Sequence, residues 1–319
     1  MRAAQRREPQ AWGGHAHEPL AFVGLRGRLA RDAALARYTT WRVGGNADLL
    51  YAPADRDDLA HFTRGLPPAL PVTMLGLGSN VLVRDGGIRG AVVLMHDPGA
   101  ALAVADGMIY ADAGVASPKL ARFAAMHGCA NAEFLAGIPG TVGGALAMNA
   151  GCYGGETWRH VARVETLARD GTFEIRTPDD YAIEYRSVHR RDGSALTEPF
   201  TAAWFRFPPG DIATSRAQIR SLLARRIATQ PLSLPNAGSV FRNPPGDHAA
   251  RLIESCGLKG CAVGGASVSE LHANFIVNPA RRARAGDIER LIVHVRSVVQ
   301  AATGVDLVPE VRILGVGAQ

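Results

Sequence analysis

The chain has 319 residues, 47% of them hydrophobic, and a formal net charge of +6. This length is typical of two or three packed domains, and no apolar run approaches the roughly 20 residues of a membrane span. The positive charge comes almost entirely from arginines spread along the chain, since Lys119 and Lys259 are the only lysines, which argues against a nucleic-acid-binding face and for attraction of small anions.

Residues 1–19 lack the apolar stretch of a signal peptide, and we expect them to form a disordered tail. Beyond the tail, a polar helix is predicted from Asp55 to about Gly65. Asp106-Gly107 predicts a tight hairpin turn. The strands predicted in this part of the chain are 47–53, 72–75, 81–83, 91–95, 101–105 and 108–112.

A further helix is predicted to begin at Ser117, whose hydroxyl would cap it, with Pro118 in its first position. Asp170-Gly171 predicts a second hairpin, formed by strands at 161–167 and 172–175. These elements mix short strands and helices, so the chain is predicted to be α+β.

The composition changes at Pro208-Pro209-Gly210. Two long amphipathic helices are predicted beyond this point, at 212–229 and 286–303, and the second has one continuous apolar face. Short strands are predicted between them, around 262–268 and 274–277. We interpret this region as an α+β module that precedes a short C-terminal return.

The first glycine-rich loop runs from Gly76 to Asn80 and reads Gly-Leu-Gly-Ser-Asn. It begins like a dinucleotide-binding fingerprint, but Val81 stands where the third glycine would be, and a strand follows instead of a helix. The amides of Gly76 and Gly78, with the side chains of Ser79 and Asn80, would therefore form a nest for a phosphate. A plain β-turn is an equally good interpretation of this loop alone.

The second glycine-rich loop spans residues 137–144. Its glycines remove side chains from a short stretch, so backbone amides can approach an anion, and Thr141 can cap a helix over 145–149. Close packing around glycine is the alternative, but phosphate binding is favoured. The candidate cofactor-binding residues of this loop are Gly137, Ile138, Gly140, Thr141, Gly143 and Gly144.

Several other polar residues carry no functional signal when each is taken alone. Arg186 ends an alternating stretch and would ordinarily be a solvated charge, Ser239 follows Gly238 as a turn hydroxyl, and Glu310 precedes a strand. The cysteines show no metal-binding spacing, so we expect reduced thiols and no metal site. They are Cys129, Cys152, Cys256 and Cys261.

Taken in order, these segments resemble one protein family over about residues 35–315. The segments are YTTWRVGG (38–45), GLGSN (76–80), AGIPGTVGGALAMNAG (136–151), YR (185–186), NAGSVFRNP (236–244), LIESCGLKG (252–260), HANFIVNP (272–279) and PEVR (309–312). They are similar to the UDP-N-acetylenolpyruvoylglucosamine reductases (MurB) of peptidoglycan synthesis.

The resemblance implies a two-subdomain FAD-binding fold of the vanillyl-alcohol-oxidase type, with an inserted α+β substrate-binding domain. It also implies that the cofactors are FAD and NADPH and that the substrate is a UDP-sugar. The expected parts are the tail 1–19, FAD-binding subdomains at 20–95 and 96–210, the substrate-binding domain at 211–303, and the C-terminal return 304–319, which carries Glu310. The expected protein is a cytoplasmic monomer that binds neither nucleic acid nor membrane.

The resemblance also assigns roles to single residues. In this family, hydride addition to an enolpyruvyl ether creates a dianionic enediolate, which Arg186 and Glu310 would stabilise, while Ser239 would donate a proton to carbon. Tyr185, Arg226 and Asn243 match positions that contact the phosphate or sugar of the substrate.

Two departures from the family pattern stand out. Ser187 follows Arg186 directly, and Leu271 stands where many members have lysine. The interval between Arg186 and Ser239 is too short for the lid loop of one branch, so the chain resembles the shorter branch. Two alternatives stay open: an alcohol or hydroxy-acid oxidase of the same fold, and a sugar-nucleotide-binding protein without catalysis.

Overall fold

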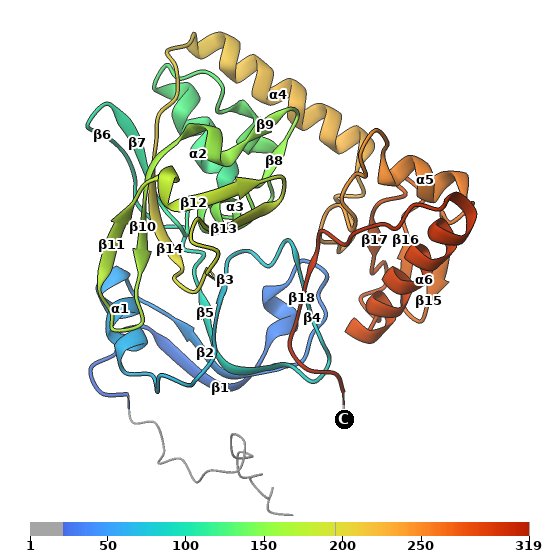
Figure 1. Cartoon of the computed structure of the whole chain (residues 1–319), viewed down its shortest axis with the longest axis horizontal. Helices are drawn as coiled ribbons and strands as arrows, with labels where there is room; N and C mark the ends of the chain where they lie inside the picture. The colour runs from blue at the N-terminus through green and yellow to red at the C-terminus, as the bar shows by residue number, and fades with distance from the viewer. Residues whose placement is uncertain (1–21, 195, 319) are drawn as a thin grey trace, which may run out of the picture.

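The computed structural model describes residues 22–194 and 196–318, so the tail predicted at 1–19 lies outside the described residues. Three modules follow one another along the chain, and the last segment returns to the first module (Figure 1). Within the described part, no helix combines the length and apolarity needed to cross a bilayer.

The first module is built on a four-stranded sheet with the order β1-β2-β5-β3. Strand β1 is antiparallel to β2, whereas β5 is parallel to both β2 and β3. Helix α1 (Arg56–Arg64) covers the sheet and begins where Asp55 accepts a hydrogen bond from the amide of Asp58. The strands are β1 (Arg28–Ala34), β2 (Asn46–Ala52), β3 (Val72–Leu75) and β5 (Ile88–Leu94). The strands and the helix predicted between residues 47 and 95 are therefore present.

The second module is a five-stranded antiparallel sheet with the order β11-β10-β14-β7-β6. Both predicted hairpins are present in it. The strands are β6 (Leu102–Ala105), β7 (Met108–Asp112), β10 (Val161–Leu167), β11 (Phe173–Arg176) and β14 (Phe200–Phe205). The smaller elements of this module are α2 (Ser117–Met126), α3 (Val142–Ala147), β8 (Gly151–Cys152), β9 (Gly155–Glu156), β12 (Tyr181–Glu184) and β13 (Ser187–Arg190).

The cap predicted for α2 is wrong. The helix follows Ala116, so Ser117 is its first residue and Pro118 its second. The Ser117 amide donates to the carbonyl of Gly140 at 2.9 Å, and its fully buried hydroxyl has no hydrogen-bond partner among the described residues. The contact with the second glycine-rich loop, and not a serine cap, therefore sets the start of this helix.

Helix α4 (Ile212–Thr229) has the predicted bounds but not the predicted apolar face. Only Ser215 and Ile219 are buried, whereas Ile227 is 68% exposed. The helix packs against α2 and the short helix η2 (Glu133–Gly137) and extends toward the third module (Figure 1). We expected the third module to begin at residue 211, but the buried apolar cluster of that module begins at Ala237.

In the third module, helix α6 (Ala285–Thr303) packs against a small three-stranded sheet and against helix α5 (Ala249–Ser255). Ile288, Leu291 and Val295 of α6 are buried, which confirms its predicted apolar face. The strands are β15 (Ala262–Val263), β16 (Ala266–Val268) and β17 (Ile276–Val277). The remaining short helices of the described chain are η1 (Leu35–Tyr38), η3 (Thr157–His160) and η4 (Pro178–Asp180).

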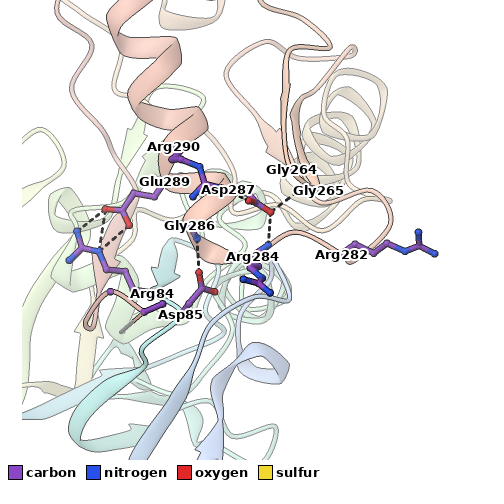
Figure 2. Close-up of a pocket in the computed structure, with 12 residues that line it drawn as sticks. Arg84, Asp85, Gly264, Gly265, Arg282, Arg284, Gly286, Asp287, Glu289 and Arg290 are labelled. Carbon is purple, nitrogen blue, oxygen red and sulfur yellow. Dashed lines mark hydrogen bonds and ion pairs between the residues drawn. The ribbon is translucent and has the colours of Figure 1, made fainter.

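Several contacts hold the third module against the first, and two of them involve buried or helix-capping groups. The indole of Trp41, which is fully buried, donates to the carbonyl of Ile276 at 2.7 Å. The carboxylate of Asp85 accepts from the amides of Ala285 and Gly286, both at 2.9 Å, and so neutralises the positive end of the α6 dipole (Figure 2). These contacts fix the position of the third module over the first.

The C-terminal return passes from the third module back to the first. Strand β18 (Arg312–Leu314) pairs in parallel with β4 (Val81–Val83), and Arg312 lies opposite Val81. The first glycine-rich loop ends at Asn80, one residue before β4. The pairing therefore brings Glu310 beside that loop.

Candidate active site

The two glycine-rich loops face each other. A β-carbon on Gly76 would lie 2.5 Å from Oγ1 of Thr141, and one on Gly140 would lie 3.4 Å from Oγ of Ser79. Thr141 caps α3, as predicted, by accepting from the amide of Gly144 at 3.4 Å. The two loops thus bring the hydroxyls of Ser79 and Thr141 close to glycines without side chains, a setting suited to an anion. The amides of Gly143 and Gly144 are already bound, to the carbonyl of Ala113 and to Oγ1 of Thr141.

Gly78 explains why the first loop needs glycine. Its φ of 63° is left-handed, and a side chain there would collide with the carbonyl of Tyr38. The carbonyl of Gly78 also accepts from the amide of Thr40 at 3.1 Å. The segment at residues 38–40 therefore fixes the position of the loop. In the sequence, this segment stands out only as part of the family pattern.

A cavity of about 620 Å³ extends from these loops between the first and second modules. Its size is within the range of small-molecule and cofactor sites. Gly76, Thr141, Gly143 and Gly144, all predicted to bind the cofactor, are among the residues that line it. Apolar residues of both modules, including Val72, Met74, Leu167 and Phe200, form its walls.

The other cofactor candidates have different surroundings. The amide of Asn80 donates from Nδ2 to the carbonyl of Glu310 at 3.3 Å. Ile138 is buried, and a side chain on Gly137 would collide with Cys152 and Tyr153. Asn80 therefore supports the segment that carries Glu310, whereas Gly137 and Ile138 lie in the part of the loop that packs against β8.

Arg186 lies in the two-residue turn between β12 and β13, with a left-handed φ of 57°. Its Nε donates to Oε1 of Glu310 at 2.7 Å, its Nη2 to the carbonyl of Gly151 at 2.6 Å, and its Nη1 to the carbonyl of Asn149 at 3.4 Å. The Arg186 and Glu310 side chains are only 14% and 18% exposed. This ion pair is consequently less screened by solvent than a surface pair.

Ser239 is tied to Glu310 through the backbone. The amide of Glu310 donates to the carbonyl of Val240, the residue after Ser239, at 2.7 Å. Gly238, with a φ of 75°, places the preceding turn, and its amide donates to the side chain of Asn236 at 2.9 Å. The structure thus brings the segments of Arg186, Ser239 and Glu310 together from two modules and the C-terminal return.

Two of the predicted substrate-binding residues, Tyr185 and Arg226, lie near Arg186. Tyr185 is 46% exposed beside Arg186, and the Arg186 guanidinium lies 4.7 Å from its ring centroid. Burial holds the pKa of the Arg226 guanidinium below its ordinary value. Burial also raises the pKa of the Cys152 thiol to about 11, while the charges of Arg226 and Arg186 oppose this shift. Arg226 therefore adds a second positive charge near the Arg186 site.

Asn243 lies at the start of the loop that precedes α5. Its Oδ1 accepts from the amide of Ala249 at 3.1 Å, which satisfies an otherwise free donor at the start of that helix. Its side chain amide thereby holds the loop that follows the Ser239 segment.

Two residues with clear roles in this arrangement were missed. Asn149 is 1% exposed and holds the hairpin of Arg186 by donating from Nδ2 to the carbonyl of Glu184 at 3.1 Å. Arg242 donates from Nη2 to the carbonyl of Arg186 at 3.2 Å. Both lie inside the quoted family segments, but their partners are backbone carbonyls far away in sequence, which leave no local pattern.

A second cavity, of about 610 Å³, lies at the N-terminus of α6 (Figure 2). It is lined by several arginines and acids, but none of the predicted site residues contributes to it. Arg84 pairs with Glu289 and Arg290 with Asp287, both at 2.7 Å or less, and Asp85 binds the helix amides. Its main charges are therefore satisfied inside the chain.

The described residues form neither a disulfide bond nor a cluster of metal ligands. The four cysteines are free thiols. Within residues 22–194 and 196–318, no group of three or more histidine, cysteine or acidic side chains could hold a metal ion.

Comparisons with known proteins agree with this geometry. Residues 47–175 match an FAD binding domain family, and residues 230–314 match the C-terminal domain of UDP-N-acetylenolpyruvoylglucosamine reductase. The chain is 54% identical over 309 residues to the UDP-N-acetylenolpyruvoylglucosamine reductase of Thiobacillus denitrificans, which covers 91% of this chain and 93% of that protein. It is 53% identical over 321 residues to the enzyme of the same name from Nitrosospira multiformis, with 94% and 92% covered.

A solved structure gives the same result. The UDP-N-acetylenolpyruvylglucosamine reductase of Thermus caldophilus superimposes with a TM-score of 0.75 and 32% sequence identity, covering 91% of this chain and 100% of that one. The predicted α+β FAD-binding architecture and the resemblance drawn from the sequence are both confirmed. The chain belongs to the UDP-N-acetylenolpyruvoylglucosamine reductase family.

Proposed function

We propose that this chain reduces UDP-N-acetylglucosamine enolpyruvate to UDP-N-acetylmuramate with FAD and NADPH, a step of peptidoglycan precursor synthesis. The observation that carries the proposal is the 2.7 Å ion pair of Arg186 with Glu310, which is hydrogen-bonded through the backbone to the residue after Ser239. A guanidinium, a carboxyl group and a hydroxyl are the groups that this reaction requires.

Ser79, Gly140 and Thr141 hold the FAD pyrophosphate in this proposal, and the cavity of about 620 Å³, which Gly143 helps to line, takes the rest of the nucleotide. When bound, FAD supplies the hydride, received from NADPH, for the terminal carbon of the enolpyruvyl group. The glycines at 76 and 140 keep the two loops free of side chains, so an anion can approach the backbone amides.

Arg186 binds the carboxylate of the substrate. A guanidinium has five N–H donors, and three of them bind Glu310, Gly151 and Asn149, so two remain for an incoming carboxylate. Hydride addition at the terminal carbon moves an electron pair toward that carboxylate and creates an enediolate. The fixed cation then stabilises the added charge, a contribution of roughly 3–4 kcal/mol for one such donor in comparable sites.

Glu310 orients Arg186 through Oε1. Its second oxygen, Oε2, has no hydrogen-bond partner among the described residues. Oε2 is therefore available to share a hydrogen bond with the substrate carboxylate as the enediolate forms.

Ser239 gives its proton to the carbon that bears the carboxylate, which completes the reduction. A serine hydroxyl is a weak acid, so it acts only on a strongly basic carbon that is held in place. The hydrogen bond between Glu310 and Val240 supplies that alignment by fixing the Ser239 backbone beside the ion pair.

We also assign the enzyme to the cytoplasm, as a monomer. Its four free cysteines suit a reducing compartment. Light scattering of the purified protein tests the second point, since a dimer would double the measured mass.

The test of the reaction is spectroscopic. The purified protein should be yellow, NADPH should bleach the flavin absorbance, and anaerobic addition of the enolpyruvyl sugar nucleotide should restore it. Restoration by oxygen alone, together with oxidation of an alcohol substrate, would instead indicate an oxidase of the same fold. A colourless protein that stays colourless with added FAD would indicate binding without catalysis.

A further inference from the structure

Arg242 contacts both the hairpin that carries Arg186 and the C-terminal return that carries Glu310. Its Nη2 donates to the carbonyl of Arg186 at 3.2 Å, and its backbone amide donates to the carbonyl of Val308, two residues before Glu310, at 2.9 Å. It also lies three residues after Ser239. One residue of the third module thus touches the Arg186 hairpin and the C-terminal return.

The Arg186 turn needs support from outside the hairpin. Glu184 pairs with Ser187, so the turn has only two residues, and the second of them, Arg186, has a φ of 57°. This left-handed conformation is unfavourable for a residue with a side chain, and persists where surrounding contacts enforce it. The hairpin forms a separate two-stranded sheet, which no strand pairing joins to the large sheet of its module.

Two residues from different modules hold this turn, one at the carbonyl before it and one at the carbonyl of its last residue. Asn149 binds the carbonyl of Glu184, before the turn, and belongs to the second module. Arg242 binds the carbonyl of Arg186, at the end of the turn, and belongs to the third module. The contact of Arg242 is therefore a link across the boundary between the two modules.

The charge of Arg242 is not used in an ion pair. No carboxylate lies within 4.0 Å of its guanidinium in the described chain, and its buried Nε has no hydrogen-bond partner there. Burying part of a cation without a counter-ion is unfavourable. A cationic donor, on the other hand, makes a stronger bond to a carbonyl than a neutral donor does.

We propose that Arg242 is a positioning residue for the reduction of the enolpyruvyl group, an inference that rests on the function proposed above. It holds the carbonyl of Arg186, keeps the turn left-handed, and so keeps the Arg186 guanidinium directed at Glu310. Because Arg242 and Ser239 share one short segment, the same contact fixes the proton donor relative to the cation. In this assignment Arg242 touches neither substrate nor cofactor.

Two variants separate this role from a general loss of folding. Arg242→Met removes the donor and the charge, and Arg242→Lys keeps both. Stopped-flow flavin absorbance measures reduction by NADPH and reoxidation by the enolpyruvyl sugar nucleotide separately. Arg220→Met, which changes an exposed arginine of α4, is the matched control and should behave as the unmodified protein.

Arg242→Met should slow reoxidation on the order of 10-fold to 100-fold, since small misplacement of a catalytic group has effects of this size. It should leave flavin content unchanged and reduction by NADPH within about twofold, and Arg242→Lys should recover reoxidation to within about threefold of the unmodified rate. Equal losses in both half-reactions, or an unchanged rate in Arg242→Met, would overturn the proposal.

A double variant tests whether Arg242 acts through Arg186. In an Arg186→Ala background, adding Arg242→Met should cause no further loss of reoxidation, because the group being positioned is already absent. A further loss of the same factor would mean that Arg242 acts on the substrate independently, and would refute the positioning role. Reoxidation of the unmodified enzyme is measured separately, and its failure would refute the proposed function itself.

Discussion

Arg186 and Glu310 lie 124 positions apart in the sequence and form a hydrogen-bonded ion pair of 2.7 Å in the fold. Each is held by other contacts as well: Arg186 by the carbonyls of Asn149 and Gly151, and Glu310 by a backbone bond to Val240. Their mutual orientation therefore exists before any substrate arrives, which is the condition for electrostatic stabilisation of a developing charge.

Ser239→Ala should separate the two half-reactions. Reduction of the flavin by NADPH should stay within about twofold, and reoxidation by the enolpyruvyl substrate should fall by roughly 10²–10³, because only the second step needs the proton. Stopped-flow absorbance measures both. Ser233→Ala, at an exposed serine of the same segment, should change neither rate. If both half-reactions slow together in Ser239→Ala, the proton-donor role is wrong.

Arg186→Lys should be nearly as damaging as removal of the side chain. An ammonium group has three donors, and Arg186 already uses three on Glu310, Gly151 and Asn149, so none would remain for the substrate carboxylate. We expect reoxidation to fall by roughly 10²-fold. The measurement is the reoxidation rate at saturating sugar nucleotide, and a lysine variant within a few-fold of the unmodified rate would contradict the assignment.

Gly140→Val should weaken FAD binding while the chain still folds. A β-carbon there lies 3.4 Å from Oγ of Ser79, so the backbone can accept it, but the branched side chain fills the space between the two loops. The dissociation constant for FAD should rise at least about 10-fold, equivalent to about 1.4 kcal/mol. Flavin fluorescence titration measures it.

The control for this change is Gly65→Val, at an exposed glycine where a β-carbon would lie 3.5 Å from the nearest atom. It should keep its FAD. Unchanged FAD affinity in Gly140→Val would show that the pyrophosphate lies elsewhere.

The half-buried ring of His272 predicts a loss of stability in mild acid. Burial lowers its pKa from the ordinary value of 6.5, and its Nδ1 accepts from the amide of Asn274 at 3.3 Å. Below pH 6.5 the unfolded chain binds this proton more readily than the folded chain does. The contribution of His272 is therefore complete above that pH and declines as the pH falls.

Urea unfolding at about pH 8 and about pH 5.5 tests this prediction. His272→Asn should lose less unfolding free energy on acidification than the unmodified chain, because the penalty for protonating the half-buried ring is gone. His294→Asn, at an exposed histidine of α6, should lose as much as the unmodified chain. Parallel losses in all three proteins would contradict the prediction.

Local structure was largely predictable from the sequence. Strands β3, β4, β7 and β10 and helix α4 have the bounds that alternation, helical spacing and turn residues predicted. The glycine-rich loops could also be recognised, because glycine spacing is a local signal. The Ser117 cap and the apolar face of α4 were predicted wrongly, since the start of α2 depends on Gly140 and the packing of α4 depends on η2.

By itself, the order of residues determined the family, the elements and the residue types available for chemistry, because these depend on short stretches of chain. Only the tertiary structure decided that the turn of one hairpin, the loop of the third module that carries Ser239 and the C-terminal return meet at one site. The contacts that make them meet, from Asn149 and Arg242 to distant carbonyls, are bonds to the backbone, and backbone groups are the same in every residue.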